Sequence, residues 1–162
     1  MASTDDTKQH LWSLIKDIKF AMLTTEDGAH LRSRPMATSQ REFDGALWFF
    51  TRASAPKVEE VRADERVNVS FSAPDDQTYV SMSGTAHVVR DAAEIDAHWS
   101  KSVAAWFPKG RADPDIALLR VDVEQAEYWD APSSSMVRGF QQAKALLTGT
   151  TPNPGENEKV TL

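Results

Sequence analysis

Short segments of alternating apolar and polar residues, each bounded by a turn signal, constrain this chain more than any other feature. Residues 67–72 alternate strictly, and most of residues 78–89 do the same. This period is typical of strands with one buried and one exposed face. Gly84 interrupts the second segment, which predicts a bulge or a barrel bend there. The chain is therefore expected to form an antiparallel sheet of short strands.

Two Asp-Gly pairs, at Asp27-Gly28 and Asp44-Gly45, predict hairpin turns. The strands expected around them and further along the chain are residues 20–25, 30–39, 46–51, 67–72, 78–89, 116–123 and 126–129. Pro35 lies inside the second strand. Because proline has no main-chain N–H, its position is expected at an edge, at a bulge or where a ligand replaces a neighbouring strand.

Helical periodicity predicts helices at residues 4–19, 92–106 and 137–147. A further helix is expected to begin at Ser54-Ala55-Pro56, with Ser54 as its cap and proline in its first turn. Residues 148–162 are expected to be a disordered tail, and residues 1–147 a single domain. Hairpin-linked strands with inserted helices favour an α+β antiparallel barrel over a parallel dinucleotide-binding fold.

Composition excludes several classes of function. A net charge of −6 over 162 residues argues against a general nucleic-acid binder. The absence of cysteine excludes disulfides, thiolate metal sites and cysteine catalysis. The four histidines, His10, His30, His87 and His98, show no ligand spacing, so no metal site is expected. The acidic start of the chain and the lack of an apolar run of about 20 residues predict a cytoplasmic protein without a membrane segment.

Cations on neighbouring segments suggest a binding site for an anion. Arg34 lies on one expected strand, and Lys57 follows Ser54 at the start of a helix. A helix N-terminus with an ammonium nearby is an arrangement that phosphates prefer. These residues predict a site for a phosphorylated aromatic ligand, with flavin mononucleotide (FMN) as the best candidate. The alternative is that the arginine and the lysine are ordinary surface residues.

Six short motifs, in this order along the chain, resemble the pyridoxamine 5'-phosphate oxidase-like superfamily and, within it, the branch of general stress proteins. They are Arg34-Pro35-Met36, residues 48–51 with Ser54 and Lys57, residues 67–71, residues 79–84, residues 106–110 with Asp113-Pro114, and Glu127-Tyr128-Trp129. The resemblance runs from about residue 8 to residue 140 and rests on the ordered set, since no single motif is specific.

The resemblance implies a split β-barrel that forms a homodimer, with FMN at each end of the subunit interface. Arg34, Pro35 and Met36 would run along the flavin ring, with Phe50 and Thr51 lining the same pocket. Ser54 and Lys57 would hold the phosphate. Trp106 and Trp129 would reach the flavin from the partner subunit, although either could instead pack at the dimer interface. Arg138 falls near a family arginine beyond the second tryptophan.

Two departures from the true oxidase bear on the reaction. The oxidase has a lysine a few residues past its first arginine, where this chain has Ala37-Thr38-Ser39. It also has an Arg-Leu-His-Asp-Arg run where residues 133–138 contain no histidine. Oxidation of pyridoxamine phosphate is therefore not expected. The predicted function is a flavin-dependent oxidoreductase of unknown substrate, with no catalytic residue assigned. The alternatives are a non-enzymatic flavin carrier or sensor, FAD in place of FMN, and a deazaflavin; haem is disfavoured.

Overall fold

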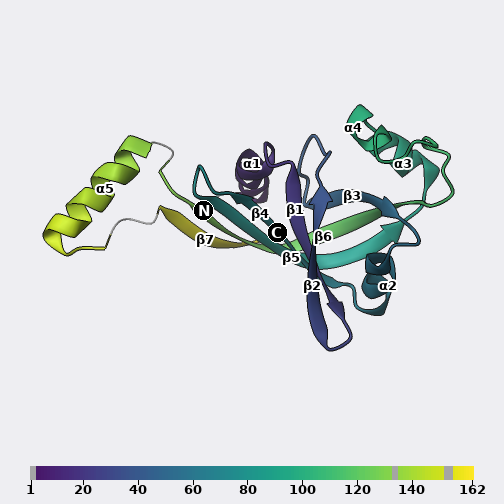
Figure 1. The fold of residues 1–162 in the computed structure, drawn as a ribbon, viewed down its shortest axis with the longest axis horizontal. Helices are drawn as coiled ribbons and strands as arrows, with labels where there is room; N and C mark the ends of the chain where they lie inside the picture. The colour runs from purple at the N-terminus through teal and green to yellow at the C-terminus, as the bar shows by residue number, and fades with distance from the viewer. Residues whose placement is uncertain (1–2, 133–134, 152–154) are drawn as a thin grey trace.

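A computed structural model describes residues 3–132, 135–151 and 155–162, and for residues 135–137 only the backbone. In chain order these residues form α1 (Thr4–Ile15), β1 (Phe20–Asp27), β2 (His30–Ala37), β3 (Ala46–Arg52), α2 (Pro56–Ala63), β4 (Arg66–Ala73), β5 (Thr78–Val89), α3 (Ala92–His98), α4 (Lys101–Ala104), β6 (Ile116–Asp130), α5 (Ser135–Thr148) and β7 (Glu156–Thr161). Figure 1 shows how these elements are arranged in space.

The strands form one antiparallel sheet in the order β2-β1-β4-β5-β6-β3, with β7 also paired to β6. The two edge strands β2 and β3 are not paired with each other, so the sheet is open. The expected α+β class with an antiparallel sheet is confirmed. Asp27-Gly28 forms the predicted hairpin turn between β1 and β2, where Gly28 has the positive φ of 60° that such a turn requires.

The second expected hairpin is wrong. Asp44-Gly45 precedes β3, but β3 pairs along its whole length with β6 and not with β2. The turn signal is local, whereas the partner of β3 lies about 70 residues further along the chain. β2 therefore has one free edge. Pro35 lies on this edge strand, where a residue without a main-chain N–H is tolerated, as expected.

β6 is a single strand of 15 residues, not the two strands expected from the sequence. It can be this long because β5 accompanies it along one side, with a register shift at Ser83/Gly84. That shift is the predicted irregularity at Gly84. A Cβ atom at this position would lie 1.9 Å from the carbonyl oxygen of Asp122, so only glycine allows the two strands to approach so closely.

The expectation of a disordered tail at residues 148–162 is wrong for residues 156–161, which form β7, while residues 152–154 lie outside the described residues. Residues 156–161 pair with the second half of β6, from Gln125 to Asp130, while β3 pairs with its first half. Without β7 this half of β6 would have unpaired main-chain groups on one side. The hydroxyl of Tyr128 in β6 also donates a hydrogen bond of 2.8 Å to the Glu158 carboxylate in β7.

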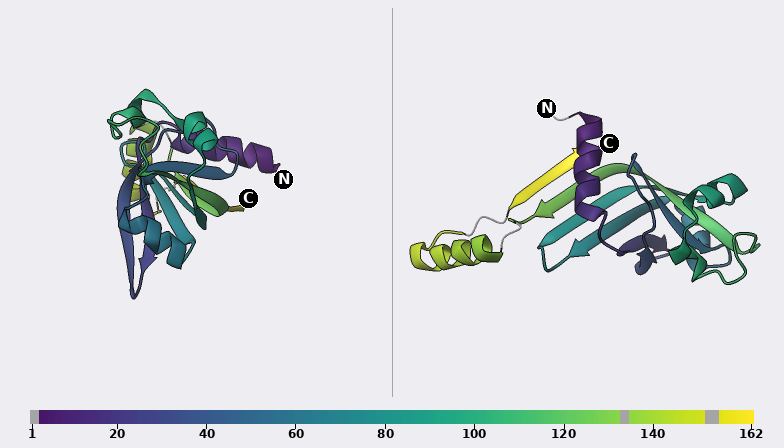
Figure 2. Two further views of the ribbon diagram at one scale, coloured as in Figure 1. Left: turned by 90° about the vertical axis from the view of Figure 1, so that its right-hand side faces the viewer. Right: turned by 90° about the horizontal axis from the view of Figure 1, so that it is seen from above.

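One main hydrophobic core fills the concave side of the sheet. Phe49, Phe71, Leu23 and Met82 are among its fully buried side chains, together with Leu11 of α1. Figure 2 shows α1 lying across the sheet. α1 begins at a capping box made by Ser3 and Asp6. α2 packs against β1 and β5.

A smaller core lies under α3 and α4, where Ile95, Val103, Phe107 and Leu118 are buried. The single helix expected at residues 92–106 is wrong, because two short helices occupy this segment. The backbone turns out of helical geometry at Trp99, and the Ser100 hydroxyl accepts a hydrogen bond from the N–H of Val103 to cap α4.

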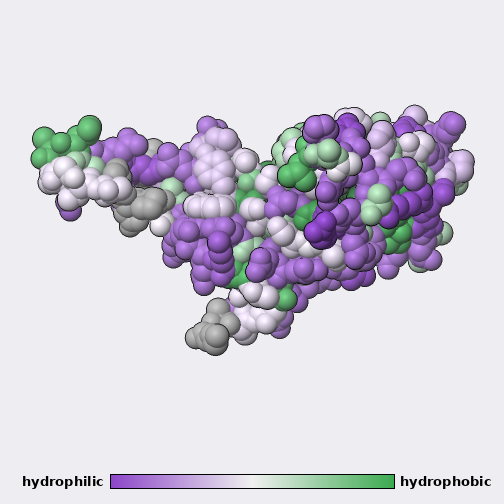
Figure 3. Space-filling view, turned by 90° about the horizontal axis from the view of Figure 1, so that it is seen from below, coloured by the Kyte–Doolittle hydropathy of each residue, from purple (hydrophilic) through white to green (hydrophobic). Residues whose placement is uncertain are grey.

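The predicted C-terminal helix is present as α5. It lies apart from the sheet, at the end of the molecule opposite α3 and α4 (Figure 1). Apolar side chains gather at its far end (Figure 3), where Leu146 and Leu147 are exposed. Among the described residues, no helix is long and apolar enough to cross a membrane.

Candidate functional site

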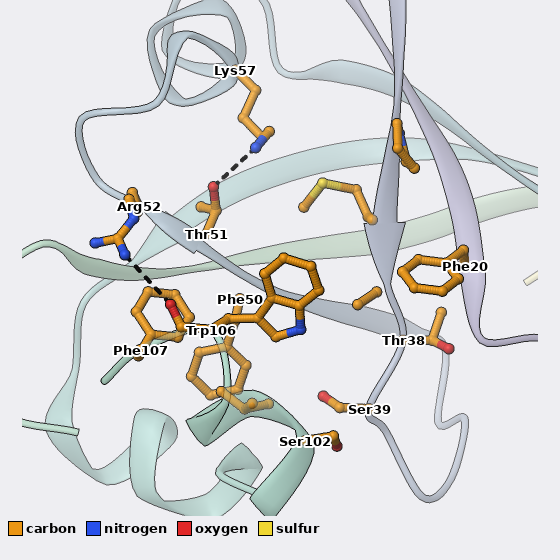
Figure 4. A pocket seen from close by; sticks show the side chains of 14 residues that line it. Phe20, Thr38, Ser39, Phe50, Thr51, Arg52, Lys57, Ser102, Trp106 and Phe107 are labelled. Atoms are coloured by element: carbon orange, nitrogen blue, oxygen red, sulfur yellow. Dashed lines mark hydrogen bonds between the residues drawn. The ribbon is translucent and has the colours of Figure 1, made fainter. Parts of the chain in front are cut away.

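A cavity of about 400 Å³ opens beside the free edge of β2. Its walls come from the β1–β2 edge and the chain that follows it, from the end of β3, from the first turn of α2 and from α4 with the chain that follows it (Figure 4). The residues that line it are Phe20, Pro35, Met36, Ala37, Thr38, Ser39, Phe50, Thr51, Arg52, Lys57, Ser102, Val103, Trp106 and Phe107. Its volume is within the range of small-molecule sites in proteins.

One side of the cavity is aromatic. Phe50 and Phe107 lie with ring centroids 6.2 Å apart, and Trp99 contacts Phe50 edge-on from behind at 5.8 Å. Trp106 is two-thirds exposed and projects toward the cavity (Figure 4). A large exposed aromatic beside a preformed apolar wall can cover a flat ring.

Arg52 holds the segment that carries this tryptophan. Its guanidinium lies 5.3 Å above the Phe107 ring, and it donates to the carbonyl oxygen of Trp106 at 3.4 Å. The carboxylates of Asp113 and Asp115 each lie 3.8 Å from the same side chain. The aromatic wall is therefore attached to the end of β3 by charge as well as by packing.

The other side of the cavity is cationic. The Nζ atom of Lys57 donates a hydrogen bond of 3.2 Å to Oγ1 of Thr51, its single hydrogen-bond partner among the described residues. Burial, and next the charge of Arg34, lower the pKa of Lys57, while Glu60 acts in the opposite direction. α2 begins at Pro56, and no side chain in the described part of the chain caps its first amides. This part of the site presents an ammonium and a helix N-terminus together.

Arg34 lies behind this cationic wall and does not line the cavity. Its Nη2 atom is 2.6 Å from Oε2 of Glu60, and its Nη1 atom donates to Oγ1 of Thr25 at 2.6 Å. Burial by itself raises the pKa of Glu60, but the hydrogen bond from Thr25 and the charges of Arg34 and Arg32 together lower it. Glu60 is therefore an ionised carboxylate in a buried position.

Comparison with known sequences matches residues 6–153 to the family described as "Pyridoxamine 5'-phosphate oxidase like". The chain belongs to this family. Protein bli-3 of Neurospora crassa is 30% identical over 156 residues, which cover 90% of this chain and 75% of that protein.

Two solved structures of general stress proteins are similar to this chain. A candidate general stress protein 26 from Jannaschia sp. CCS1 has a TM-score of 0.80 and 28% identity, over 98% of this chain and 100% of the other. The general stress FMN/FAD binding protein from Xanthomonas citri has a TM-score of 0.71 and 30% identity, over 81% of this chain and 93% of the other.

This pyridoxamine 5'-phosphate oxidase-like chain brings most of the sequence-predicted site residues to one cavity. Those that line it are Pro35, Met36, Phe50, Thr51, Lys57 and Trp106. Three others lie elsewhere. Arg34 is paired with Glu60, as described above. Trp129 lies on β6 opposite Tyr79 of β5, away from the cavity of its own chain.

Ser54 is the third, and its expected role as helix cap is wrong. The N-cap of α2 is Ala55, while the hydroxyl and the main-chain N–H of Ser54 donate to the Asp115 carboxylate at 2.9 and 3.0 Å. The Ser54 hydroxyl bonds to Asp115 instead of capping α2 because hydrogen bonds to an ionised carboxylate are stronger than those between neutral groups. The same hydroxyl is the main cause that lowers the pKa of Asp115.

Arg138 does not line the cavity either, and it bonds to main-chain groups. It donates to the carbonyl oxygens of Pro132 and Asp75 at 2.9 and 3.1 Å, which attaches the start of α5 to the turn between β4 and β5.

Sequence reasoning missed several lining residues. Phe107 was recognisable as part of the Trp106-Phe107-Pro108 cluster, and Arg52 directly follows Thr51. Phe20 and Ser102 carry no comparable signal, because they reach the cavity only through the way β1 and α4 are placed around β3.

Proposed function

We propose that this protein is a homodimeric FMN-binding general stress protein and that FMN binds in the cavity beside β2. The observation that carries the proposal is one cavity with an aromatic wall, a free strand edge and a partly desolvated ammonium at a helix N-terminus. The ammonium at the helix N-terminus would bind the flavin phosphate. The aromatic wall and the free strand edge would contact the flavin ring.

The ring of the flavin would lie along Pro35 and Met36, against Phe50 and under Trp106. Because β2 is an edge strand, its outward main-chain groups are available to the polar edge of the ring. Bound flavin supplies electron and hydride transfer, and the protein supplies the pocket, its orientation and its electrostatics.

The phosphate would be held by Lys57, with Thr51 beside it. Lys57 has already lost part of its hydration and has no ion pair among the described residues. An ion pair with a phosphate dianion would therefore compensate for the lost hydration of its ammonium. In this proposal Arg34 contributes its positive charge from the layer behind Lys57. Ser54, in the loop before α2, would have to release the Asp115 carboxylate to reach the phosphate.

The split barrel of each subunit would form the homodimer through the face of its sheet opposite the core. Met22, Ser70 and Ser81 lie side by side on this face, because they are register partners across β1, β4 and β5. Tyr79 and Trp129 form a neighbouring exposed pair. Phe20 and Pro35 line the cavity close to this face. In this proposal Trp129 of a partner subunit would reach the flavin site across the interface.

Oxidation of pyridoxamine phosphate is not part of the proposal. Ala37, Thr38 and Ser39 line the cavity and bring no cation where the resemblance to the true oxidase would place a lysine. Arg138 is already bonded to two main-chain carbonyls. The substrate is therefore expected to lack a phosphate group like that of pyridoxamine phosphate.

The first experiment is to denature the purified protein and identify any released ligand by mass spectrometry. Flavin-free protein is then titrated with FMN, riboflavin and FAD. FMN is expected to bind most tightly, and protein that binds none of the three contradicts the proposal. Anaerobic addition of NADH or NADPH separates an oxidoreductase, whose flavin absorbance bleaches, from a non-enzymatic flavin carrier, whose flavin stays oxidised.

A further inference from the structure

Glu60 is the centre of a buried network that joins α2 to the first hairpin. Oε2 of Glu60 accepts a hydrogen bond of 2.6 Å from Thr25 on β1 and lies 2.6 Å from Nη2 of Arg34 on β2. Its other oxygen, Oε1, lies 2.7 Å from Nη1 of Arg32. The Glu60 side chain is 7% exposed and that of Arg34 is 16% exposed.

The register of the hairpin explains why these groups meet. Thr25 is the partner of Arg32 and Leu23 is the partner of Arg34, so all of these side chains point to the same face of the β1–β2 ribbon. α2 packs on that face. Glu60 lies on α2 one turn after Lys57, which places the network directly behind the cationic wall of the cavity.

We infer that Glu60 is a positioning residue that fixes α2, with Lys57, relative to the β2 edge at Pro35 and Met36, and that it thereby sets the preference for FMN over riboflavin. This inference rests on the proposed function. FMN would contact both parts of the site, whereas riboflavin would contact only the ring part. A fixed distance between the two parts therefore strengthens the binding of FMN alone, because less freedom is lost when the second contact forms.

A purely electrostatic role for Glu60 would have the opposite sign. A carboxylate near the phosphate repels it, so removing that charge would strengthen FMN binding if position did not matter. The two roles are therefore distinguishable by the direction of the effect.

The test compares dissociation constants for FMN and riboflavin, measured by flavin fluorescence on the full-length, flavin-free protein. Glu60→Gln keeps the shape of the side chain but removes its charge. Thr25→Val breaks two hydrogen bonds of the network and changes no charge. Glu59→Gln is the matched control, since Glu59 is the exposed neighbour on α2 and pairs only with Arg62 among the described residues.

Glu60→Gln is expected to lower the preference for FMN over riboflavin about tenfold, which corresponds to about 1.4 kcal/mol. Thr25→Val is expected to lower it about threefold, or about 0.65 kcal/mol, and Glu59→Gln to leave it unchanged. Equal losses for both ligands, or a stronger FMN preference in Glu60→Gln with no change in Thr25→Val, overturn the inference. If Glu60→Gln does not fold, Thr25→Val decides. The wild-type preference itself tests the proposed function separately.

Discussion

The ammonium of Lys57 lies 3.2 Å from the hydroxyl of Thr51, partly withdrawn from water and without an ion pair among the described residues. Burial is the first cause that lowers the pKa of Lys57 below its ordinary value of 10.5, and the charge of Arg34 is the second. In the absence of a ligand, this cation is therefore less well solvated in the folded protein than in the unfolded chain.

Replacing Lys57 with methionine is expected to stabilise the flavin-free protein at neutral pH and to weaken FMN binding by about tenfold or more, with riboflavin little affected. The methionine removes a desolvated charge but also the proposed phosphate partner. Thermal unfolding with and without FMN measures both effects. Lys109→Met, at an exposed lysine outside the cavity, serves as the control. A parallel loss of riboflavin binding would show that the phosphate lies elsewhere.

The preference for FMN over riboflavin is expected to fall as the pH rises from 7 toward 10.5. A lowered pKa means that Lys57 loses its proton, and its attraction for phosphate, below 10.5. The FMN phosphate stays a dianion throughout this range, because its second pKa is about 6. Titrations at several pH values give the ratio of the two dissociation constants, which should be flat in Lys57→Met. The folded, flavin-free protein should gain stability over the same interval, since the unfolded chain binds the proton more tightly.

Gly84→Ala is expected to destabilise the protein by more than about 2 kcal/mol, because its Cβ would meet the Asp122 carbonyl oxygen at 1.9 Å and force β5 and β6 apart. Gly139→Ala is the control, since a Cβ on that helix position meets no described atom within 4 Å. It should be neutral or stabilising by up to about 1 kcal/mol. Denaturant unfolding measures both, and an unchanged midpoint in Gly84→Ala would contradict the close approach of the strands.

Met22→Glu is expected to raise the dissociation constant of the proposed homodimer at least about tenfold, because it places a charge on a face that would be desolvated. Leu146→Glu, which changes an equally apolar exposed side chain on the distant helix α5, should leave the dimer intact. Sedimentation velocity distinguishes the two. A wild-type protein that sediments as a monomer at all concentrations would rule out the dimer.

Tyr128 is expected to make stability fall between about pH 10 and pH 12. Burial, followed by the hydrogen bond to Glu158 and the charge of that carboxylate, raises the pKa of Tyr128 from 10.0 to about 12. Between these values the unfolded chain releases a proton that the folded protein retains, so the free energy of unfolding decreases as the pH rises. Tyr128→Phe should lose about 1 kcal/mol at neutral pH and should lack this slope. Unfolding measured across the interval tests the attachment of β7.

The strands nearest to strong local signals were predictable from the sequence. The alternation at residues 67–72, the turn at Asp27-Gly28 and the irregularity at Gly84 each depend on a few neighbouring residues, and each is present in the structure. The partner of β3 was not predictable in this way, since the Asp44-Gly45 turn is compatible with pairing to either β2 or β6.

Much of the candidate site was also predictable, because the family motifs name residues on β2, β3 and the start of α2. The side-chain partners were not. Arg34 bonds to Glu60 and Ser54 bonds to Asp115, because in each case an ionised carboxylate lies closer to the side chain than the cavity does. Neither carboxylate is adjacent in the sequence to the residue that it binds.

The sequence by itself determined the alternating strands, the sharp turns and the residue types that a flavin site would need. The tertiary structure alone decided that β6 runs unbroken, that β7 covers its second half, and which cations face the cavity and which face Glu60. Strand formation follows from the preferences of neighbouring residues, whereas strand partners and buried ion pairs depend on groups that come together only when the whole sheet has assembled.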